Sequence, residues 1–322
     1  MTDSQAGAHE FDLIDRIRRR VNTRDDVVLG IGDDAALLHV PAGRLLVIAA
    51  DTLNAGVHFP EDTAPADIGW KSLAVNLSDL AAMGAEPAWC TLSLSLPAGD
   101  ADWVDGFLDG FLELAHMHGV ALIGGDTTRG PLSISVTVHG FAAPGRVLRR
   151  DAARIDDDIW VSGTPGDAAG ALAQWREGVA RDGFLRSRLD RPTPCLALGF
   201  ALADVAHACI DVSDGLLADL THICRASGVG ARVELEALPA SDALRAAFDD
   251  ATRHALQASG GDDYELCFTA PADLREEIER LSRETATPVA RIGRIEAGEG
   301  VRAMDGRGLQ WTPGRAGYQH FA

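Results

Sequence analysis

Aspartates recur in this chain where apolar runs give way to glycine or small polar residues. The five segments are Gly32-Asp33-Asp34, Ala50-Asp51-Thr52, Gly125-Asp126-Thr127, Asp211-Val212-Ser213-Asp214-Gly215 and Gly261-Asp262-Asp263. Neighbouring carboxylates repel one another unless a hard cation such as Mg2+ neutralises them through oxygen ligands. Asp and Gly are also common turn residues, and Asp often caps a helix, so one such segment alone carries little weight. The five together indicate a site where several magnesium ions bind a polyanion.

Other sequence signatures of phosphate and hydrolytic chemistry are missing. The chain has no Gly-x-x-x-x-Gly-Lys-Ser/Thr loop, and its only lysine, Lys71, lies inside a helical pattern. A protein-kinase catalytic loop, a zinc-type His/Cys spacing and a Gly-x-Ser-x-Gly nucleophile elbow are also absent. Phosphoryl transfer needs mainly positioning and charge neutralisation, which aspartates and Mg2+ can provide. The residue types therefore favour phosphoryl transfer without a P-loop.

Composition limits the class of protein further. With 322 residues, of which 46% are hydrophobic, the chain can form two domains with substantial cores. Its net charge of −19 argues against nucleic acid and anionic membranes as partners. The five cysteines contain no Cys-x-x-Cys pair, and there is no apolar run of membrane-spanning length and no hydrophobic signal core. We expect a cytoplasmic protein that is not exported.

The elements that would position the aspartates follow from hydrophobic periodicity. In the helix predicted over 66–83, Leu73, Leu77 and Leu80 form a buried stripe, while Asn76 and Asp79 share another face, so this helix aims Asp79. Further helices are predicted over 10–21 and 102–118, and strands over 27–31, 44–50, 89–96, 120–123 and 132–141, with the second strand ending at Asp51 and the fourth ending before Asp126.

A domain boundary is predicted near residues 144–156, where Pro144, Gly145, four arginines and three consecutive aspartates interrupt the apolar rhythm. Beyond it we expect strands over 159–162, 228–235, 265–269 and 288–295, helices after Asp167 and over 271–286, and a helix, strand, acidic turn and helix over 190–224. The pattern predicts an α+β protein with two domains, residues 1–150 and 151–322, in which the N-terminal sheet is mixed or antiparallel.

The motifs, taken in order, resemble the thiamine-monophosphate kinase family. They are GIGDDAALL from Gly30, DTLNAGVHF from Asp51, KSLAVNLSDLAAMGAEP from Lys71, LIGGDTTRGP from Leu122, IDVSDGL from Ile210, SGGDDYELCF from Ser259 and the stretch from Gly317 to Phe321. They span nearly the whole chain. The resemblance implies an enzyme of the aminoimidazole-ribonucleotide-synthetase-like superfamily, which phosphorylates thiamine monophosphate to thiamine diphosphate with ATP and Mg2+, the last step of thiamine diphosphate biosynthesis.

The resemblance also implies how the domains divide the work. The N-terminal domain would form a homodimer and carry the ATP site, and an α/β sandwich-like C-terminal domain would complete the nucleotide and substrate sites. The implied magnesium ligands are Asp33, Asp34, Asp51, Asp79, Asp126, Asp211 and Asp214. The implied ATP contacts are Gly125, Asp126, Arg150 and Ser213. The implied contacts to thiamine monophosphate are His58, Asp262, Asp263 and Tyr318.

The chain departs from the family pattern at two places. Asp262 stands where many relatives carry Glu, and Ala49 and Ala50 stand where Ser or Thr is frequent, so hydroxyl ligands are lost there. No residue is assigned as catalytic base or nucleophile. A phosphate monoester has a second pKa of about 6 and is already largely dianionic at neutral pH, so its oxygen can attack without a base.

Two other functions remain open. One is another ATP-using reaction of the same superfamily, such as that of aminoimidazole ribonucleotide synthetase or formylglycinamidine synthetase. A selenophosphate synthetase would need a reactive cysteine in an N-terminal segment, whereas the first cysteine here is Cys90, and a hydrogenase-maturation dehydratase would need a C-terminal cysteine, whereas this chain ends in Phe321-Ala322. The other is a nucleotide-binding regulator without turnover. ADP release that depends on thiamine monophosphate would distinguish the kinase from both.

Overall fold

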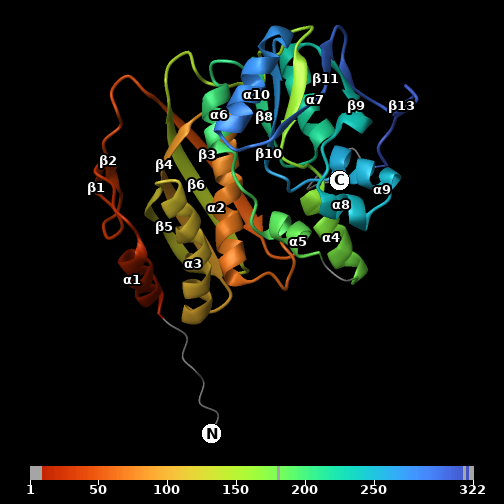
Figure 1. The fold of residues 1–322 in the computed structure, drawn as a ribbon. Coiled ribbons are helices and arrows are strands. Elements are labelled where there is room, and N and C mark those ends of the chain that lie inside the picture. The colour runs from red at the N-terminus through yellow and green to blue at the C-terminus, as the bar shows by residue number, and fades with distance from the viewer. Residues whose placement is uncertain (1–8, 180–181, 315–316, 319–322) are drawn as a thin grey trace. The chain divides into compact units, whose positions relative to one another are not determined.

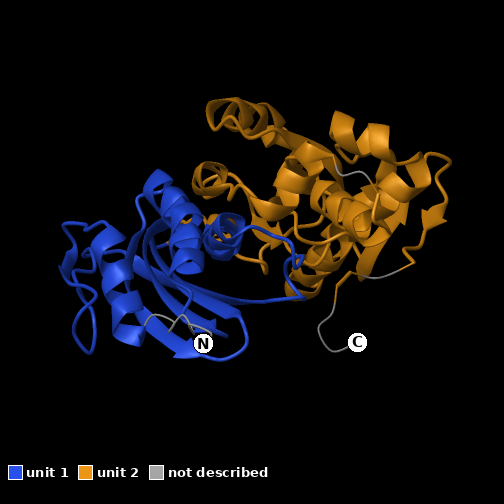
Figure 2. Ribbon diagram, turned by 90° about the horizontal axis from the view of Figure 1, so that it is seen from below, with its two compact units in different colours: residues 1–80, 86–144 blue, residues 81–85, 145–322 orange. Residues whose placement is uncertain are grey.

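The computed structural model describes residues 9–179, 182–314 and 317–318. The chain divides into two compact units (Figure 2). Unit 1 contains residues 1–80 and 86–144, and unit 2 contains residues 81–85 and 145–322. Among the described residues, no helix combines the length and the apolar character needed to cross a membrane.

Unit 1 is built around a four-stranded sheet of order β3-β6-β4-β5 (Figure 1). The strand pairs β3·β6 and β6·β4 are antiparallel and β4·β5 is parallel, so the sheet is mixed, as predicted. Its elements are α1 (Glu10–Arg20), β1 (Val27–Leu29), β2 (Leu37–Leu38), β3 (Leu45–Asn54), α2 (Pro65–Ala82), β4 (Glu86–Leu96), α3 (Ala101–Met117), β5 (Ala121–Arg129) and β6 (Ser133–Ala142).

The two long helices of unit 1, α2 and α3, lie along one face of this sheet (Figure 1). The predicted stripe is confirmed, because Leu73, Leu77 and Leu80 are fully buried. The helices approach each other at backbone distance: a Cβ on Gly110 of α3 would stand 1.8 Å from the carbonyl oxygen of Ala66. Glycine is therefore required at this crossing, which fixes α2 and the polar residues that α2 carries.

Two strands of unit 1 continue beyond their predicted ends. β3 does not end at Asp51 but runs on to Asn54, and β5 passes through Asp126 to Arg129. Thr52, Thr127 and Thr128 are polar but β-branched, and they keep pairing with β6 and β4. The two aspartates therefore have fixed positions in a sheet rather than in turns.

Among its described residues, unit 2 contains a seven-stranded sheet of order β13-β12-β9-β11-β7-β10-β8, in which only the pair β12·β9 is parallel. Its strands are β7 (Asp158–Ser162), β8 (Ala208–Val212), β9 (Gly230–Glu234), β10 (Glu265–Ala270), β11 (Val289–Glu296), β12 (Gly300–Met304) and β13 (Gln310–Trp311). Its helices are α4 (Asp167–Glu177), α5 (Gly183–Asp190), α6 (Leu196–Leu202), α7 (Leu216–Ser227), α8 (Asp242–Ala247), α9 (Asp250–Ser259) and α10 (Arg275–Glu284), with short 3-10 turns η1 (Leu235–Ala237) and η2 (Ala272–Leu274).

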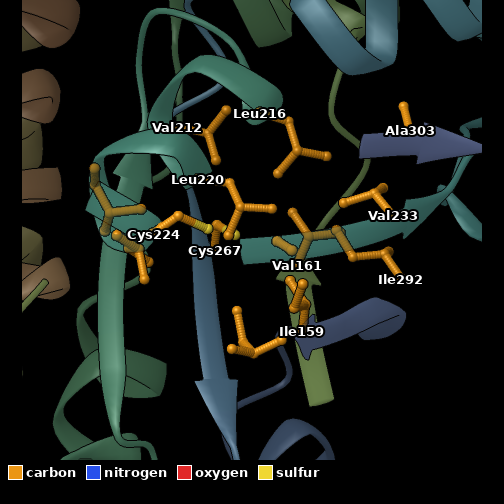
Figure 3. Close-up of a cluster of buried hydrophobic side chains, with 14 of the residues drawn as sticks. Ile159, Val161, Val212, Leu216, Leu220, Cys224, Val233, Cys267, Ile292 and Ala303 are labelled. Atoms are coloured by element: carbon orange, nitrogen blue, oxygen red, sulfur yellow. The ribbon is translucent and has the colours of Figure 1, made fainter. Parts of the chain in front are cut away.

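The main core of unit 2 lies between α7 and this sheet (Figure 3). Leu216, Leu220 and Cys224 of α7 meet the β-branched residues Ile159 and Val161 of β7. Every residue of β7, β8 and β10 is buried, as in strands that are covered on both faces. Burying one face of α7 against the sheet holds the start of this helix, and with it the acidic loop that precedes it.

Candidate functional site

Asp51 of unit 1 is held by α2. The backbone N–H of Asp51 donates to Oδ1 of Asn76 over 2.8 Å, and Nδ2 of Asn76 donates to the carbonyl of Ser72 over 2.9 Å. Asn76 is fully buried, so its amide is fixed by these two bonds. Asp79 lies one helical turn further along the same face of α2. The structure thus brings two of the predicted metal ligands, Asp51 and Asp79, to the same part of unit 1.

Gly125 and Asp126 follow a bulge in β5. The pairing of β5 with β4 shifts at Ile123, which has no partner of its own. Such a bulge re-aims the side chains that follow it. Gly125 then adopts a φ of +150°, and a Cβ there would lie 1.8 Å from the carbonyl oxygen of Leu92. Only glycine fits beside β4 at this point, and Asp126 is exposed next to it.

Asp126 and Asp51 are not brought together within the unit. Across the paired strands, Asp51 is in register with Leu92 and Gly125, and Asp126 is in register with Thr52, the residue after Asp51. β3 and β5 are three strand spacings apart, about 14 Å at ordinary strand spacing. Successive residues of a strand point to opposite faces of a sheet. The two carboxylates therefore occupy separate places in unit 1.

Asp33 and Asp34 lie in an exposed turn of unit 1 between β1 and β2. The backbone N–H of Asp34 donates to Oδ1 of Asp33 over 2.8 Å. Gly32, at a φ of +128°, lets the turn pass close to the guanidinium of Arg18. The second carboxylate is thereby presented to solvent, while the first helps to shape the turn.

His58 of unit 1 is half-buried and oriented by its neighbours. Its Nδ1 accepts the backbone N–H of Asn54 over 2.9 Å, which places the proton of the neutral ring on Nε2. Its carbonyl accepts from Nζ of Lys71 over 3.0 Å. Lys71, the only lysine of the chain, is 1% exposed, so its hydrogen bond holds the backbone at His58 from the interior of the unit.

The acidic loop of unit 2, residues 211–215, begins with the last two residues of β8 and leads into α7. Asp211, the penultimate residue of β8, is 5% exposed, and Ser213 and Asp214 are half-buried. Oδ2 of Asp219 in α7 accepts three backbone N–H groups of the loop, from Ser213 at 3.0 Å and from Asp214 and Gly215 at 3.1 Å each. Asp219, which the sequence analysis did not select, therefore fixes the course of the loop.

Two further segments meet the acidic loop. The N–H of Asp262 donates to the carbonyl of Ser213 over 2.9 Å, and the N–H of Tyr318 donates to the carbonyl of Asp214 over 3.0 Å. Asp262 has a φ of +69° and Tyr264 a φ of +52°, two left-handed non-glycine residues in one turn. Strained backbone of this kind often marks a functional site. Unit 2 thus gathers predicted metal, nucleotide and substrate residues within one group of loops.

Asp263 lies apart from this group, in the interior of unit 2. It is 2% exposed, and its Oδ2 accepts the N–H of Gly166 over 2.8 Å. Burial raises the pKa of its carboxyl well above the usual range. In this arrangement the side chain anchors the turn before α4, and a contact with substrate would require a different conformation.

Arg150 is exposed in unit 2, and its carbonyl accepts the hydroxyl of Ser227 over 3.0 Å. Its position after the unit boundary is fixed through the backbone, which leaves the guanidinium on the surface. Of the C-terminal motif, Gly317 and Tyr318 are described, and Tyr318 is 44% exposed. Gln319, His320 and Phe321 lie outside the described residues.

The carboxylates suit Mg2+ that is completed by a bound phosphate. Within the described ranges, no group of three or more His, Cys, Asp or Glu side chains is arranged to hold a metal ion. Mg2+ commonly takes only one or two carboxylates, with water and substrate phosphates as its other ligands. In unit 2, burial together with the charges of Asp211 and Asp214 raises the pKa of Asp219 to about 7. This excess of negative charge is what a bound cation would relieve.

The chain is similar to known proteins over nearly its whole length. The chain matches the models of the AIR synthase related protein N-terminal domain over residues 32–142 and C-terminal domain over residues 154–306. It is 48% identical over 320 residues to the thiamine-monophosphate kinase of Salmonella typhimurium (strain LT2), covering 97% of this chain and 98% of that protein. The chain belongs to the thiamine-monophosphate kinase family.

Solved structures of thiamine-monophosphate kinases have the same fold. The crystal structure of the protein from Stenotrophomonas maltophilia K279a aligns with a TM-score of 0.86 at 57% identity, covering 91% of this chain and 96% of that chain. AaThiL complexed with AMPPCP and TMP aligns with a TM-score of 0.77 at 30% identity, covering 100% and 99%. The predicted α+β fold and the predicted family are thus confirmed.

Proposed function

We propose that this protein transfers the γ-phosphoryl group of ATP to thiamine monophosphate and forms thiamine diphosphate. The observation that carries the proposal is the 48% identity to a thiamine-monophosphate kinase across nearly the whole chain. A relative that aligns over the full length of this chain was solved with an ATP analogue and TMP, which supports the same two substrates here.

Magnesium ions belong to this proposal. Their ligands would be Asp51 and Asp79 in unit 1 and Asp211 and Asp214 in unit 2. Asp126 and the exposed Asp33 and Asp34 would be further ligands in unit 1. When bound, Mg2+ would neutralise the phosphate oxygens and lower the repulsion between the two reacting anions. Gly125, Asp126, Arg150 and Ser213 would contact ATP.

The acceptor needs orientation rather than activation. His58, Asp262 and Tyr318 would bind thiamine monophosphate, and Asp263 would do so only after leaving its buried contact with Gly166. Asp262, shorter than the Glu of many relatives, would reach the substrate from a strained turn tied to Ser213. The phosphate dianion would attack in line, with Arg150 adding positive charge at the transferred group. We assign no catalytic base and no covalent intermediate.

ADP release from ATP tests the proposal. With Mg2+ present, we expect release only when thiamine monophosphate is added, and no phosphorylated protein during turnover. Tight ATP binding without release in the presence of thiamine monophosphate would favour the regulator instead. A phosphoprotein trapped during turnover would contradict direct transfer while leaving the kinase activity in place.

A homodimer formed through unit 1 is also proposed. β3 is an edge strand of its sheet and exposes three large apolar side chains, Leu45, Leu46 and Ile48, of which Ile48 is 57% exposed. Exposed apolar edge strands are usually covered by a partner.

A cytoplasmic location is proposed as well. The five cysteines are all free and buried, which supports it.

Ile48→Asp is expected to weaken the dimer at least about 100-fold, because it places a charge in the centre of an apolar contact. Light scattering after size exclusion, across a dilution series, would measure this change. Leu309→Asp is the matched control, since Leu309 is also 57% exposed but lies in unit 2. If Ile48→Asp remained dimeric at the dilutions where the wild type does, β3 would not be the interface.

A further inference from the structure

Asp219 occupies an unusual place at the start of α7. It is 3% exposed, yet one oxygen of its carboxylate accepts the three successive backbone N–H groups of Ser213, Asp214 and Gly215. These bonds turn three N–H groups of the acidic loop inward. Gly215, at a φ of +129°, permits the turn, because a Cβ there would lie 2.8 Å from the carbonyl oxygen of Ser259.

The carbonyl groups of the same loop point the other way and bind the neighbouring segments. The carbonyl of Ser213 accepts from Asp262, and that of Asp214 accepts from Tyr318. The peptide units that join Ser213 to Asp214 and Asp214 to Gly215 are therefore each held on one side by Asp219 and on the other by a residue assigned to substrate. A movement of the loop would displace the side chain of Asp214 and both outer segments together.

We propose that Asp219 is a positioning residue, which sets the orientation of Ser213 and Asp214 towards nucleotide and metal and couples them to Asp262 and Tyr318. The role rests on the proposed function, since it assigns Asp219 to the same site. Asp219 itself does not touch substrate. It acts by accepting hydrogen bonds, so an uncharged oxygen acceptor of the same shape should retain part of the effect and a methyl group none.

A simpler role is stabilisation of the α7 N-terminus, where a carboxylate interacts favourably with the helix dipole. If this were the only role, substituting Asp219 would lower thermal stability but would not change how the folded enzyme responds to Mg2+ or thiamine monophosphate. The two roles differ in a second way. Only the positioning role requires that the amides of residues 213–215 lose protection while those of the body of α7 keep it.

The experiment compares Asp219→Asn and Asp219→Ala with the wild type in the full-length protein. Hydrogen exchange of peptides covering residues 211–216 and 260–264 is measured without ligand, followed by the Mg2+ dependence of the kinetics. Removing a residue that orients a metal ligand typically costs about 10- to 100-fold in metal affinity. For Asp219→Ala we expect at least about 10-fold faster exchange at residues 213–215 and a Mg2+ half-saturation raised by about 10-fold. Asp219→Asn should lie between this variant and the wild type.

Asp157→Asn is the matched control. Asp157 is a buried carboxylate of unit 2, 3% exposed, that accepts the N–H of Arg154 over 2.9 Å outside the acidic loop. The Asp157→Asn substitution should lower Tm without changing hydrogen exchange at residues 213–215 or the Mg2+ concentration at half-saturation. If Asp219→Ala does not fold, Asp219→Asn decides alone.

The proposal is overturned if the folded Asp219 variants keep exchange at residues 213–215 and Mg2+ half-saturation within twofold of the wild type. The hydrogen-exchange result does not depend on the substrate. If the wild type failed to turn over thiamine monophosphate, the proposed function would fall, and binding of Mg2+ with a non-hydrolysable ATP analogue would replace the kinetic measurement. Faster exchange together with weaker binding of the analogue would then still support the role of Asp219.

Discussion

Asp214→Asn is expected to lower turnover at least about 100-fold at saturating Mg2+, because it removes one carboxylate oxygen and the negative charge that would hold the ion. The substitution should leave the loop in place. Its anchors are backbone groups, the N–H of Asp214 bound to Asp219 and its carbonyl bound by Tyr318. Initial rates of ADP formation over a range of Mg2+ concentrations, with Tm measured in parallel, would give the effect. Asp79→Asn should behave in the same way.

The matched control for Asp214→Asn is Asp242→Asn. Asp242 is an exposed aspartate in the first turn of α8 in unit 2, and none of the predicted site residues lies in that helix. We expect this variant to keep turnover within about twofold of the wild type, since an exposed charge at a helix start has only a small effect on stability. Near-normal turnover of Asp214→Asn at saturating Mg2+ would show that Asp214 is not a metal ligand.

Gly125→Ala is expected to destabilise unit 1 by about 3 kcal/mol or more, which corresponds to a loss of roughly 10 °C in Tm. A Cβ at this position would lie 1.8 Å from the carbonyl oxygen and 2.6 Å from the carbonyl carbon of Leu92. Both are backbone atoms of β4, so β4 and β5 would have to separate next to Asp126. Calorimetry would measure the change in Tm, and ATP-analogue binding would measure the effect on the site.

Gly124→Ala is the control for Gly125→Ala, because it adds the same methyl group one residue earlier. A Cβ on Gly124 meets no atom within 4 Å, and its φ is not left-handed. The Tm of this variant should change by no more than about 2 °C, since a methyl group that enters open space at an ordinary backbone position has a small effect. Equal stability of the two variants would contradict the close approach of β4 and β5 at Gly125.

Periodicity was sufficient to place the long elements of the fold. The helices α1, α2 and α3 are confirmed to within one or two residues, because each carries apolar residues at helical spacing. Periodicity failed where an element is short or polar. The helices α5, α8 and α9 and the strands β12 and β13 were not predicted. Each has ten residues or fewer, and β12 also depends on pairing with the distant strand β9.

The candidate site could be predicted only in part. Aspartates at the ends of apolar runs marked Asp51 and Asp126, but the strands continue through both, because pairing with neighbours extends beyond the apolar run. Asn76 shares a helical face with Asp79, and this spacing was a usable signal for its role. Asp219 gave no such signal, since its function arises from three backbone groups that only the folded loop presents to it.

The central claim is that thiamine monophosphate is the acceptor, and product analysis with a panel of acceptors tests it most directly. The purified protein would be incubated with ATP and Mg2+ and, in separate reactions, with thiamine, thiamine monophosphate or aminoimidazole precursors, and the products would be identified by mass spectrometry. We predict one thiamine diphosphate for each ADP with thiamine monophosphate, and no ADP with the other acceptors. ADP formed with an aminoimidazole precursor, or no thiamine diphosphate from thiamine monophosphate, would contradict the claim.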